Sequence, residues 1–143
     1  MAANNSKDSV FQITDSGGTL RDLSSYLNSV DGLPGERELN EKTALGDSGR
    51  KYITGLENVT VSLEGHYDNT ATSGPDVVLG SLRTHTAAVA FDYGPEGSST
   101  ADSDVKYSGN CFVRSYVLSS RVGDIVAFRC ELQVDGAVTR GTY

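Results

Sequence analysis

The feature that most constrains the fold is a long alternating stretch near the end of the chain, between Asp104 and Asp135. In its second half, small or polar residues (Ala127, Arg129, Glu131 and Gln133) separate the apolar residues Val126, Phe128, Cys130, Leu132 and Val134. A period of two predicts a half-buried strand, because successive side chains of a strand point to opposite faces of a sheet. We therefore expect residues 126–134 to form a strand whose apolar face packs in the core.

Residues 106–118 provide the other arm of the same hairpin. Tyr107, Cys111, Val113 and Val117 are predicted to share one face. The short connection at residues 120–124 contains a glycine and suits an antiparallel turn. Strands usually run ~5–6 residues. Arms of this length therefore either bend across two packed sheets or extend beyond the core to meet another subunit.

Size and composition indicate one turn-rich β domain. A chain of 143 residues can bury a real core, which we place at residues 10–135, between a flexible arm at 1–9 and a polar tail at 136–143. The net charge of −7 repels phosphate and argues against tight binding of nucleic acid. No apolar run approaches the ~20 residues of a membrane span. Residues 1–9 also lack the pattern of a secretory signal.

The two cysteines, Cys111 and Cys130, are expected to be free thiols. They lie on opposite arms of the predicted hairpin. A tight turn, however, would place Cys130 opposite a residue other than Cys111, so the spacing does not favour a disulfide.

Further strands are predicted at residues 10–13, 59–63 and 87–93, where apolar residues again alternate or cluster. A single short helix is expected at about residues 74–84, because Pro75 is tolerated in a first turn and Asp76 suits the helix dipole. Residues 19–27 fit either one helical turn or a bend that leads into a strand.

Residues 36–51 form a long charged excursion within this pattern. Its charged residues are Glu36, Arg37, Glu38, Glu41, Lys42, Asp47, Arg50 and Lys51. Long loops in compact domains are usually functional or mobile. The stretch is either a solvated loop, which the composition alone favours, or an assembly arm that becomes ordered against a neighbouring subunit.

The sequence offers little catalytic chemistry. His66 and His85 are the only histidines, and neither has metal-site spacing with the other or with the cysteines. No nucleophile elbow, P-loop or dinucleotide-binding glycine pattern is present. The Ser/Asp pairs at residues 15–18 and 46–49 are ordinary turn sequences. We expect no catalytic, cofactor-binding or metal-binding residues, and an enzyme is the least favoured class.

Several short blocks, taken in order, resemble the major tail tube proteins of bacteriophages with long, non-contractile tails. The blocks are residues 33–40, 43–47, 52–59, 74–76, 83–88, 93–97, 106–109 and 138–141. The resemblance covers nearly the whole chain from Val10.

The resemblance implies a mainly β fold, an antiparallel sandwich or partly closed barrel with one short flanking helix and a long early loop. Hexameric rings of such a subunit would stack into a tube in the virion tail. The proteins at the tube ends would be further partners, and DNA would pass through the lumen without specific binding. The family uses an early loop to contact the next ring, and residues 36–51 lie at the matching place. The resemblance also implies synthesis in the cytoplasm of the bacterial host.

Two alternatives stay open. One is a related ring protein, from a tail terminus or an injection apparatus, that shares this fold type. The other is a monomeric ligand-binding sandwich. That class usually presents exposed aromatic residues to sugars, whereas this chain has no Trp.

A lumen that lets DNA slide should be neutral or acidic, because Lys or Arg would hold phosphates. The candidates on polar strand faces are Glu64, Glu131 and Asp135, with Arg129 as a possible ion-pair partner of Glu131. The alternative is that these residues face solvent on the outside of the tube. A strand's polar face does not by itself distinguish the two.

Overall fold

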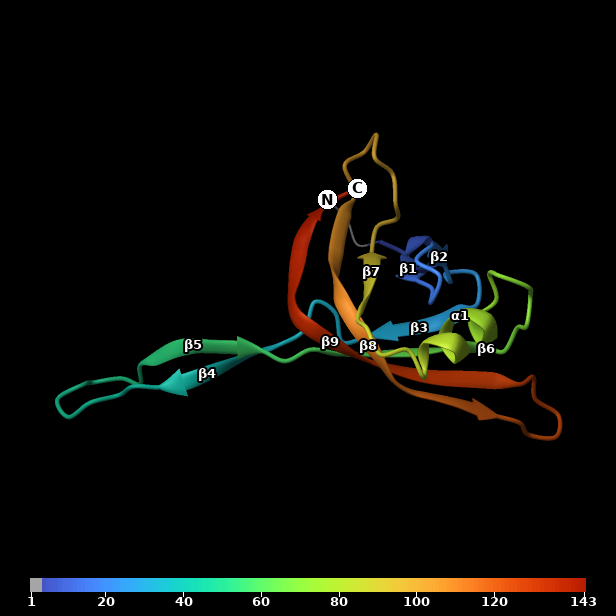
Figure 1. Ribbon diagram of the computed structural model, residues 1–143. Helices are drawn as coiled ribbons and strands as arrows, with labels where there is room; N and C mark the ends of the chain where they lie inside the picture. The colour runs from blue at the N-terminus through green and yellow to red at the C-terminus, as the bar shows by residue number, and fades with distance from the viewer. Residues whose placement is uncertain (1–3) are drawn as a thin grey trace.

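The computed structural model describes residues 4–143, and its body is one curled antiparallel sheet (Figure 1). The sheet has seven strands in the order β2-β1-β7-β8-β9-β6-β3. Their bounds are β1 Val10–Thr14, β2 Leu20–Asp22, β3 Leu27–Asp31, β6 Thr60–His66, β7 Val89–Gly94, β8 Val105–Ser119 and β9 Ala127–Thr142. The predicted mainly β class with one short helix is confirmed, in the form of a partly closed barrel.

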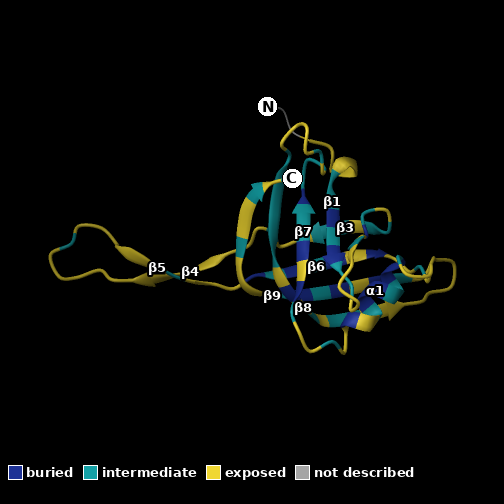
Figure 2. Ribbon diagram, turned by 45° about the horizontal axis from the view of Figure 1, so that its top comes forward, coloured by how far each residue is buried: buried dark blue, intermediate teal, exposed yellow. Residues whose placement is uncertain are grey.

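The core lies on the inner face of the curled sheet, where alternate residues of β1, β6, β7 and β9 are buried (Figure 2). Its buried residues are Phe11, Ile13, Leu23, Val59, Val61, Leu63, Val78, Leu79, Leu82, Val89, Phe91, Cys111, Phe128, Cys130, Leu132 and Val134. The rings of Phe11 and Phe91 stack with centroids 6.2 Å apart and join β1 to β7. Burial of this apolar surface is the main favourable term in folding.

The predicted helix is confirmed as α1, Pro75–Leu82, which packs on β8. Pro75 occupies its first turn, and Val78, Leu79 and Leu82 point into the core. The hydroxyl of Tyr116 donates a hydrogen bond to Asp76 at 3.1 Å, which joins the first turn of α1 to β8. Burial and the neighbouring Asp76 carboxylate both raise the pKa of Tyr116.

The β8–β9 hairpin has the predicted antiparallel form, but its first arm changes face part-way along. Val113 pairs with Leu132 and Ser115 with Glu131, so Arg114 is an extra residue in a bulge. Beyond the bulge the alternation is inverted. Tyr116 faces inward, its ring centroid 5.8 Å from that of Phe128, whereas Val117 is 58% exposed. The predicted inward position of Val117 was wrong, because sequence periodicity does not reveal an inserted residue.

The predicted polar tail at 136–143 is instead mostly strand, since β9 continues to Thr142. Ser108 pairs with Thr139 and Asn110 with Asp135, so residues 136–138 form a bulge at which Gly136 has a φ of 89°. This polar segment can join the sheet without an apolar core of its own, because hydrogen bonds to β8 satisfy the N–H and C=O groups of its backbone.

Residues 19–27 take the second of the two predicted forms, a bend that leads into a strand. β2 pairs with β1, Leu23 is buried, and a turn at residues 24–26 leads to β3. Of the predicted flexible arm, residues 1–3 lie outside the described residues, and Ser6–Asp8 form a short 3-10 helix, η1. The Ser9 hydroxyl donates a hydrogen bond to the Pro95 carbonyl at 2.9 Å.

The prediction for the cysteines is confirmed. Both thiols are free and fully buried, and Cys111 lies opposite Val134 while Cys130 lies opposite Tyr116. Burial raises the pKa of each thiol to about 12.

Candidate functional site

A two-stranded arm projects from the body and is separate from the main sheet (Figure 1). It consists of β4 Arg37–Glu41, β5 Tyr52–Glu57 and the loop between them. Every residue of β4 is exposed, and in β5 only Gly55 is partly covered. The predicted charged loop is therefore a hairpin that extends away from the core.

The loop at the end of the arm is closed by its own hydrogen bonds. The Lys42 amide donates to the Lys51 carbonyl at 2.8 Å, and the Ala44 amide donates to the Asp47 carboxylate at 2.8 Å. Lys51 also pairs with Asp47, with Nζ 3.0 Å from Oδ1. The Ala44 amide and then Lys51 lower the pKa of Asp47. These local bonds give the loop a defined shape without contact to the body.

The structure places seven of the eight predicted contact residues on this arm, and the eighth, Glu36, directly precedes β4. Arg37 lies opposite Glu57 in the bulged part of the β4–β5 ladder, and Arg50 Nη1 is 3.9 Å from Glu41 Oε2. Such exposed pairs contribute little stability, ~0–1 kcal/mol each. Charged side chains on an exposed edge do, however, discourage unspecific strand pairing.

Sequence reasoning missed the apolar residues of the arm. Leu39 and Tyr52 are 56% and 48% exposed, and the register places them on one face, while Ile53 lies on the other. Leu56 is 82% exposed near the base. The apolar residues Tyr52, Ile53 and Leu56, which directly follow the charged segment, were the signal that could have revealed them. A lone two-stranded hairpin is marginally stable in water, so the exposed apolar residues on both faces make the arm a candidate contact surface.

The tip of the β8–β9 hairpin is a second projecting apolar element. We define the hairpin tip as residues 117–126. It exposes Val117, Leu118, Val122, Ile125 and Val126, with Val122 fully exposed and Ile125 65% exposed. In Figure 1 the hairpin tip and the arm lie at opposite ends of the molecule. Of the two forms expected for these long arms, the hairpin tip shows the extension beyond the core.

The candidate lumen residues lie on the sheet face turned away from the core. Glu64 of β6 is opposite Arg129 of β9, with Arg129 Nε 3.2 Å from Glu64 Oε1, and Ser62 is opposite Glu131. Arg129 therefore pairs with Glu64 rather than with Glu131. Asp135 is exposed further along β9, just before the bulge.

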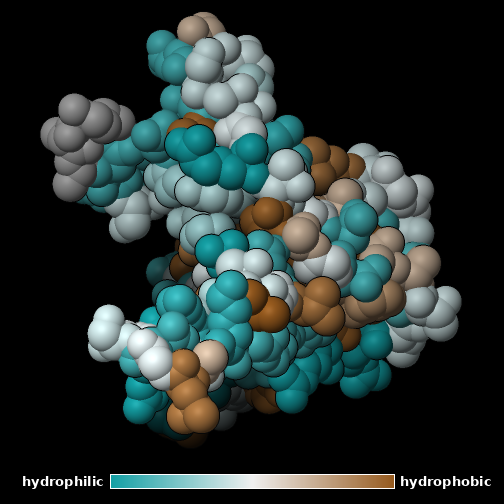
Figure 3. Space-filling model, turned by 90° about the vertical axis from the view of Figure 1, so that its left-hand side faces the viewer, coloured by the Kyte–Doolittle hydropathy of each residue, from teal (hydrophilic) through white to brown (hydrophobic). Residues whose placement is uncertain are grey.

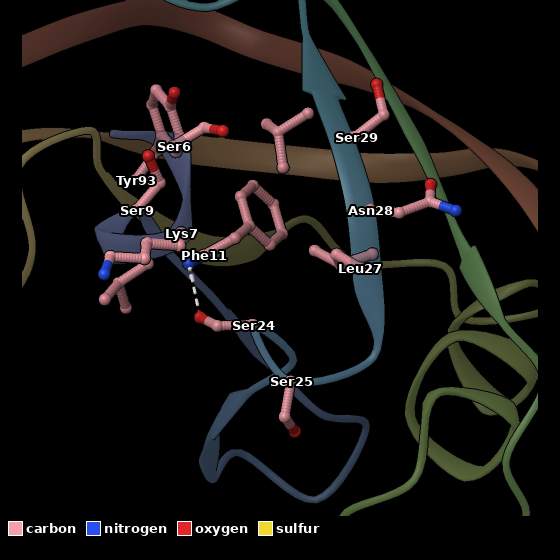
Figure 4. Close-up of a pocket in the computed structure, with 12 residues that line it drawn as sticks. Ser6, Lys7, Ser9, Phe11, Ser24, Ser25, Leu27, Asn28, Ser29 and Tyr93 are labelled. Carbon is pink, nitrogen blue, oxygen red and sulfur yellow. Dashed lines mark hydrogen bonds between the residues drawn. The ribbon is translucent and has the colours of Figure 1, made fainter. Parts of the chain in front are cut away.

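The main sheet does not close, and a groove of about 470 Å³ separates β1 from β3 (Figure 4). Serine hydroxyls, apolar side chains, Lys7 and Asn28 line it, and the Phe11 amide donates to the Ser24 hydroxyl at 2.9 Å. Its described lining includes no His, Cys, Asp or Glu side chain. Within residues 4–143, no group of three or more His, Cys, Asp or Glu could hold a metal ion. In the same part of the chain, no helix is long and apolar enough to cross a membrane.

Comparison with known proteins gives a consistent fold assignment. The sequence matches no protein-family model and no curated protein. The fold matches the SPP1 tail tube with a TM-score of 0.76 and 17% identity, covering 99% of this chain and 80% of that chain. It matches a chain in the tail of an empty gene transfer agent particle, a structure with C6 symmetry, with a TM-score of 0.74 and 14% identity over 96% and 98% of the two chains.

The tube-terminating cap of the anti-feeding prophage is also similar, with a TM-score of 0.69 and 12% identity over 100% of this chain and 93% of that chain. At these identities the likeness establishes the fold. The chain has the fold found in tail tubes and in the caps that end them, which confirms the resemblance at that level.

Proposed function

We propose that this protein is the structural subunit of a phage tail tube, and that it assembles into rings that stack in the virion tail. The observation that carries the proposal is the combination of a tail tube fold over nearly the full chain with an exposed arm that has no partner in its own subunit. Exposed apolar side chains that gather on one projecting element are a feature of interaction sites.

The arm is the contact between rings in this proposal. Its exposed strands and self-closed loop reach beyond the body, where a neighbouring ring would lie. The charged residues predicted for this contact are Glu36, Arg37, Glu38, Glu41, Lys42, Asp47, Arg50 and Lys51. They would form the polar rim around the apolar residues of the arm, as in protein interfaces generally.

Contacts within a ring would use the two ends of the curled sheet. Within residues 4–143, the outer edge of β3 has no strand beside it, and β2 at the other end is only Leu20–Asp22. Joining these ends between neighbours would continue the sheet around the ring and remove its exposed edges.

The polar face that carries Glu64, Glu131 and Asp135 is the candidate wall of the lumen. On this face, Arg129 forms an ion pair with Glu64. The carboxylates of Glu131 and Asp135 would then keep the wall acidic, so that a DNA backbone would be repelled rather than held.

A tube terminator is the second candidate, because the anti-feeding prophage cap matches the whole chain. A terminator would form rings that do not stack on both sides, whereas a tube subunit would form long tubes.

Negative-stain electron microscopy of the purified full chain tests the proposal. Long tubes of uniform diameter support the tail tube subunit, and isolated rings with no tubes support the terminator. Featureless particles, with the mass of a single chain in sedimentation, would refute both and return a monomeric binding module to consideration.

A further inference from the structure

We propose that the apolar residues of the arm in one copy bind the hairpin tip of the next copy, so that successive rings connect head to tail. The arm surface is the face of Leu39 and Tyr52, and the tip residues are Val122 and Ile125. This inference rests on the proposed tube function and names the partner of the arm.

The first argument is the uneven distribution of exposed apolar side chains. Among residues 4–143, thirteen large apolar side chains are exposed. Ten of these belong to the arm or to the hairpin tip: Leu39, Leu45, Tyr52, Ile53, Leu56, Val117, Leu118, Val122, Ile125 and Val126. Figure 3 looks at the end that carries the arm and shows separate apolar patches on a mainly hydrophilic surface. Burial of the exposed apolar side chains would therefore be favourable for both the arm and the hairpin tip, and each offers an apolar surface to the other.

The second argument is their placement at opposite ends of the subunit (Figure 1). A shift of one copy along the line from the arm to the hairpin tip brings the arm of one copy beside the tip of the next. Two different surfaces that meet in this way make a heterologous contact, which repeats without closing and generates an open filament. A stacked tube requires this kind of contact along its axis.

The third argument is chemical. Val122 is fully exposed and Ile125 is 65% exposed, so both lose contact with water when covered. Arg121 and Asp124 flank them in the tip, and charged residues flank Leu39 on the arm. An apolar centre with a charged rim is the usual composition of a specific protein interface.

The first experiment uses the double variant Val122→Asp/Ile125→Asp, with Thr100→Asp/Ala101→Asp as the matched control. Both pairs are exposed and receive the same added charge, so neither should unfold the subunit. The tip variant is expected to form rings but at least tenfold fewer tubes, whereas the control assembles like the wild type. Normal tubes from the tip variant would overturn the inference.

The second experiment identifies the contact directly by disulfide formation between Leu39→Cys chains and Ile125→Cys chains. The native thiols are fully buried and do not compete. A mixture of the two variants should give a cross-linked dimer upon oxidation of assembled tubes, and each variant alone should not. Dimers from Leu39→Cys alone would indicate arm-to-arm contact, and tubes without a mixed dimer would place the tip elsewhere; both results refute the proposal.

The two proposals fail in different ways. If the wild type forms tubes but the mixed Leu39→Cys and Ile125→Cys chains give no arm-to-tip cross-link, the function stands and this inference falls. If the wild type forms neither tubes nor rings, the function falls, and the inference falls with it.

Discussion

Gly65 permits the contact between β3 and β6, and replacing it with alanine should separate these strands. Gly65 lies opposite Leu27, and a Cβ atom at this position would lie 2.2 Å from the Tyr26 carbonyl oxygen and 3.0 Å from the Phe128 ring. The nearest obstacle is backbone, which cannot rotate away as a side chain can. The two strands would have to separate by roughly 1 Å to restore ordinary contact.

The cost has two parts. Overpacking of a well-packed site costs about 1–3 kcal/mol. The hydrogen bond from the His66 amide to the Tyr26 carbonyl, 2.9 Å long, would also stretch, and the loss of one such bond costs about 1 kcal/mol. We therefore expect Gly65→Ala to lower the free energy of unfolding by about 2–4 kcal/mol, a large part of the ~5–15 kcal/mol of a typical domain.

Urea unfolding of the unassembled subunit, followed by circular dichroism, measures this change. Gly141→Ala is the matched control, because Gly141 also lies in a strand and has open space around its Cβ position. The control should change stability by less than about 0.5 kcal/mol. Equal stability of the two variants would show that the close approach at Gly65 does not constrain the sheet.

Replacing residues 37–51 with a short Gly/Ser linker should leave a folded subunit that forms no tubes in electron micrographs, since the arm contributes nothing to the core; normal tubes would contradict this. Thiol titration should find two free groups per chain after denaturation and almost none in the folded protein, because burial raises the pKa of Cys111 and Cys130 to about 12; two fast-reacting thiols in the folded state would be inconsistent with burial. Because the folded state retains these protons while the unfolded thiols lose them above their ordinary pKa of 9.0, the free energy of unfolding should fall as pH rises from 9 toward 12, by about 1.4 kcal/mol per thiol and pH unit in denaturant titrations. A free energy of unfolding that does not change over that pH range would contradict the raised pKa of the two thiols. Glu64→Lys/Glu131→Lys should assemble normally but slow or block DNA ejection from intact particles, and ejection at the normal rate would remove these residues from the channel wall.

Part of the proposed assembly site could be predicted from the sequence, because charge and chain breaks are local. The charged residues of segment 36–51 marked it as an excursion from the domain. What could not be predicted was that Leu39 and Tyr52 share an exposed face. Apolar residues in alternating segments are normally assigned to a core, and only the tertiary structure shows that β4 and β5 have no core to cover.

The sequence by itself determined the elements whose signals are local. The alternation from Phe128 to Val134 requires a strand with one buried face, and Pro75 with Asp76 marks the start of the only α-helix in the described chain. The separation of the two cysteines in the hairpin also followed from the sequence, since strand pairing from a short turn fixes which residues lie opposite each other.

Tertiary structure alone decided the features that depend on pairing between distant segments. The extra residue at Arg114 inverts the faces of β8, and hydrogen bonds to β8 extend β9 through a polar segment that has no apolar period. The sequence could identify Gly65 as a glycine within a strand. It could not show that the backbone of Tyr26 approaches so closely that only glycine fits there. Periodicity records which residues can share a face, whereas register and close approach depend on a partner strand that the local sequence does not contain.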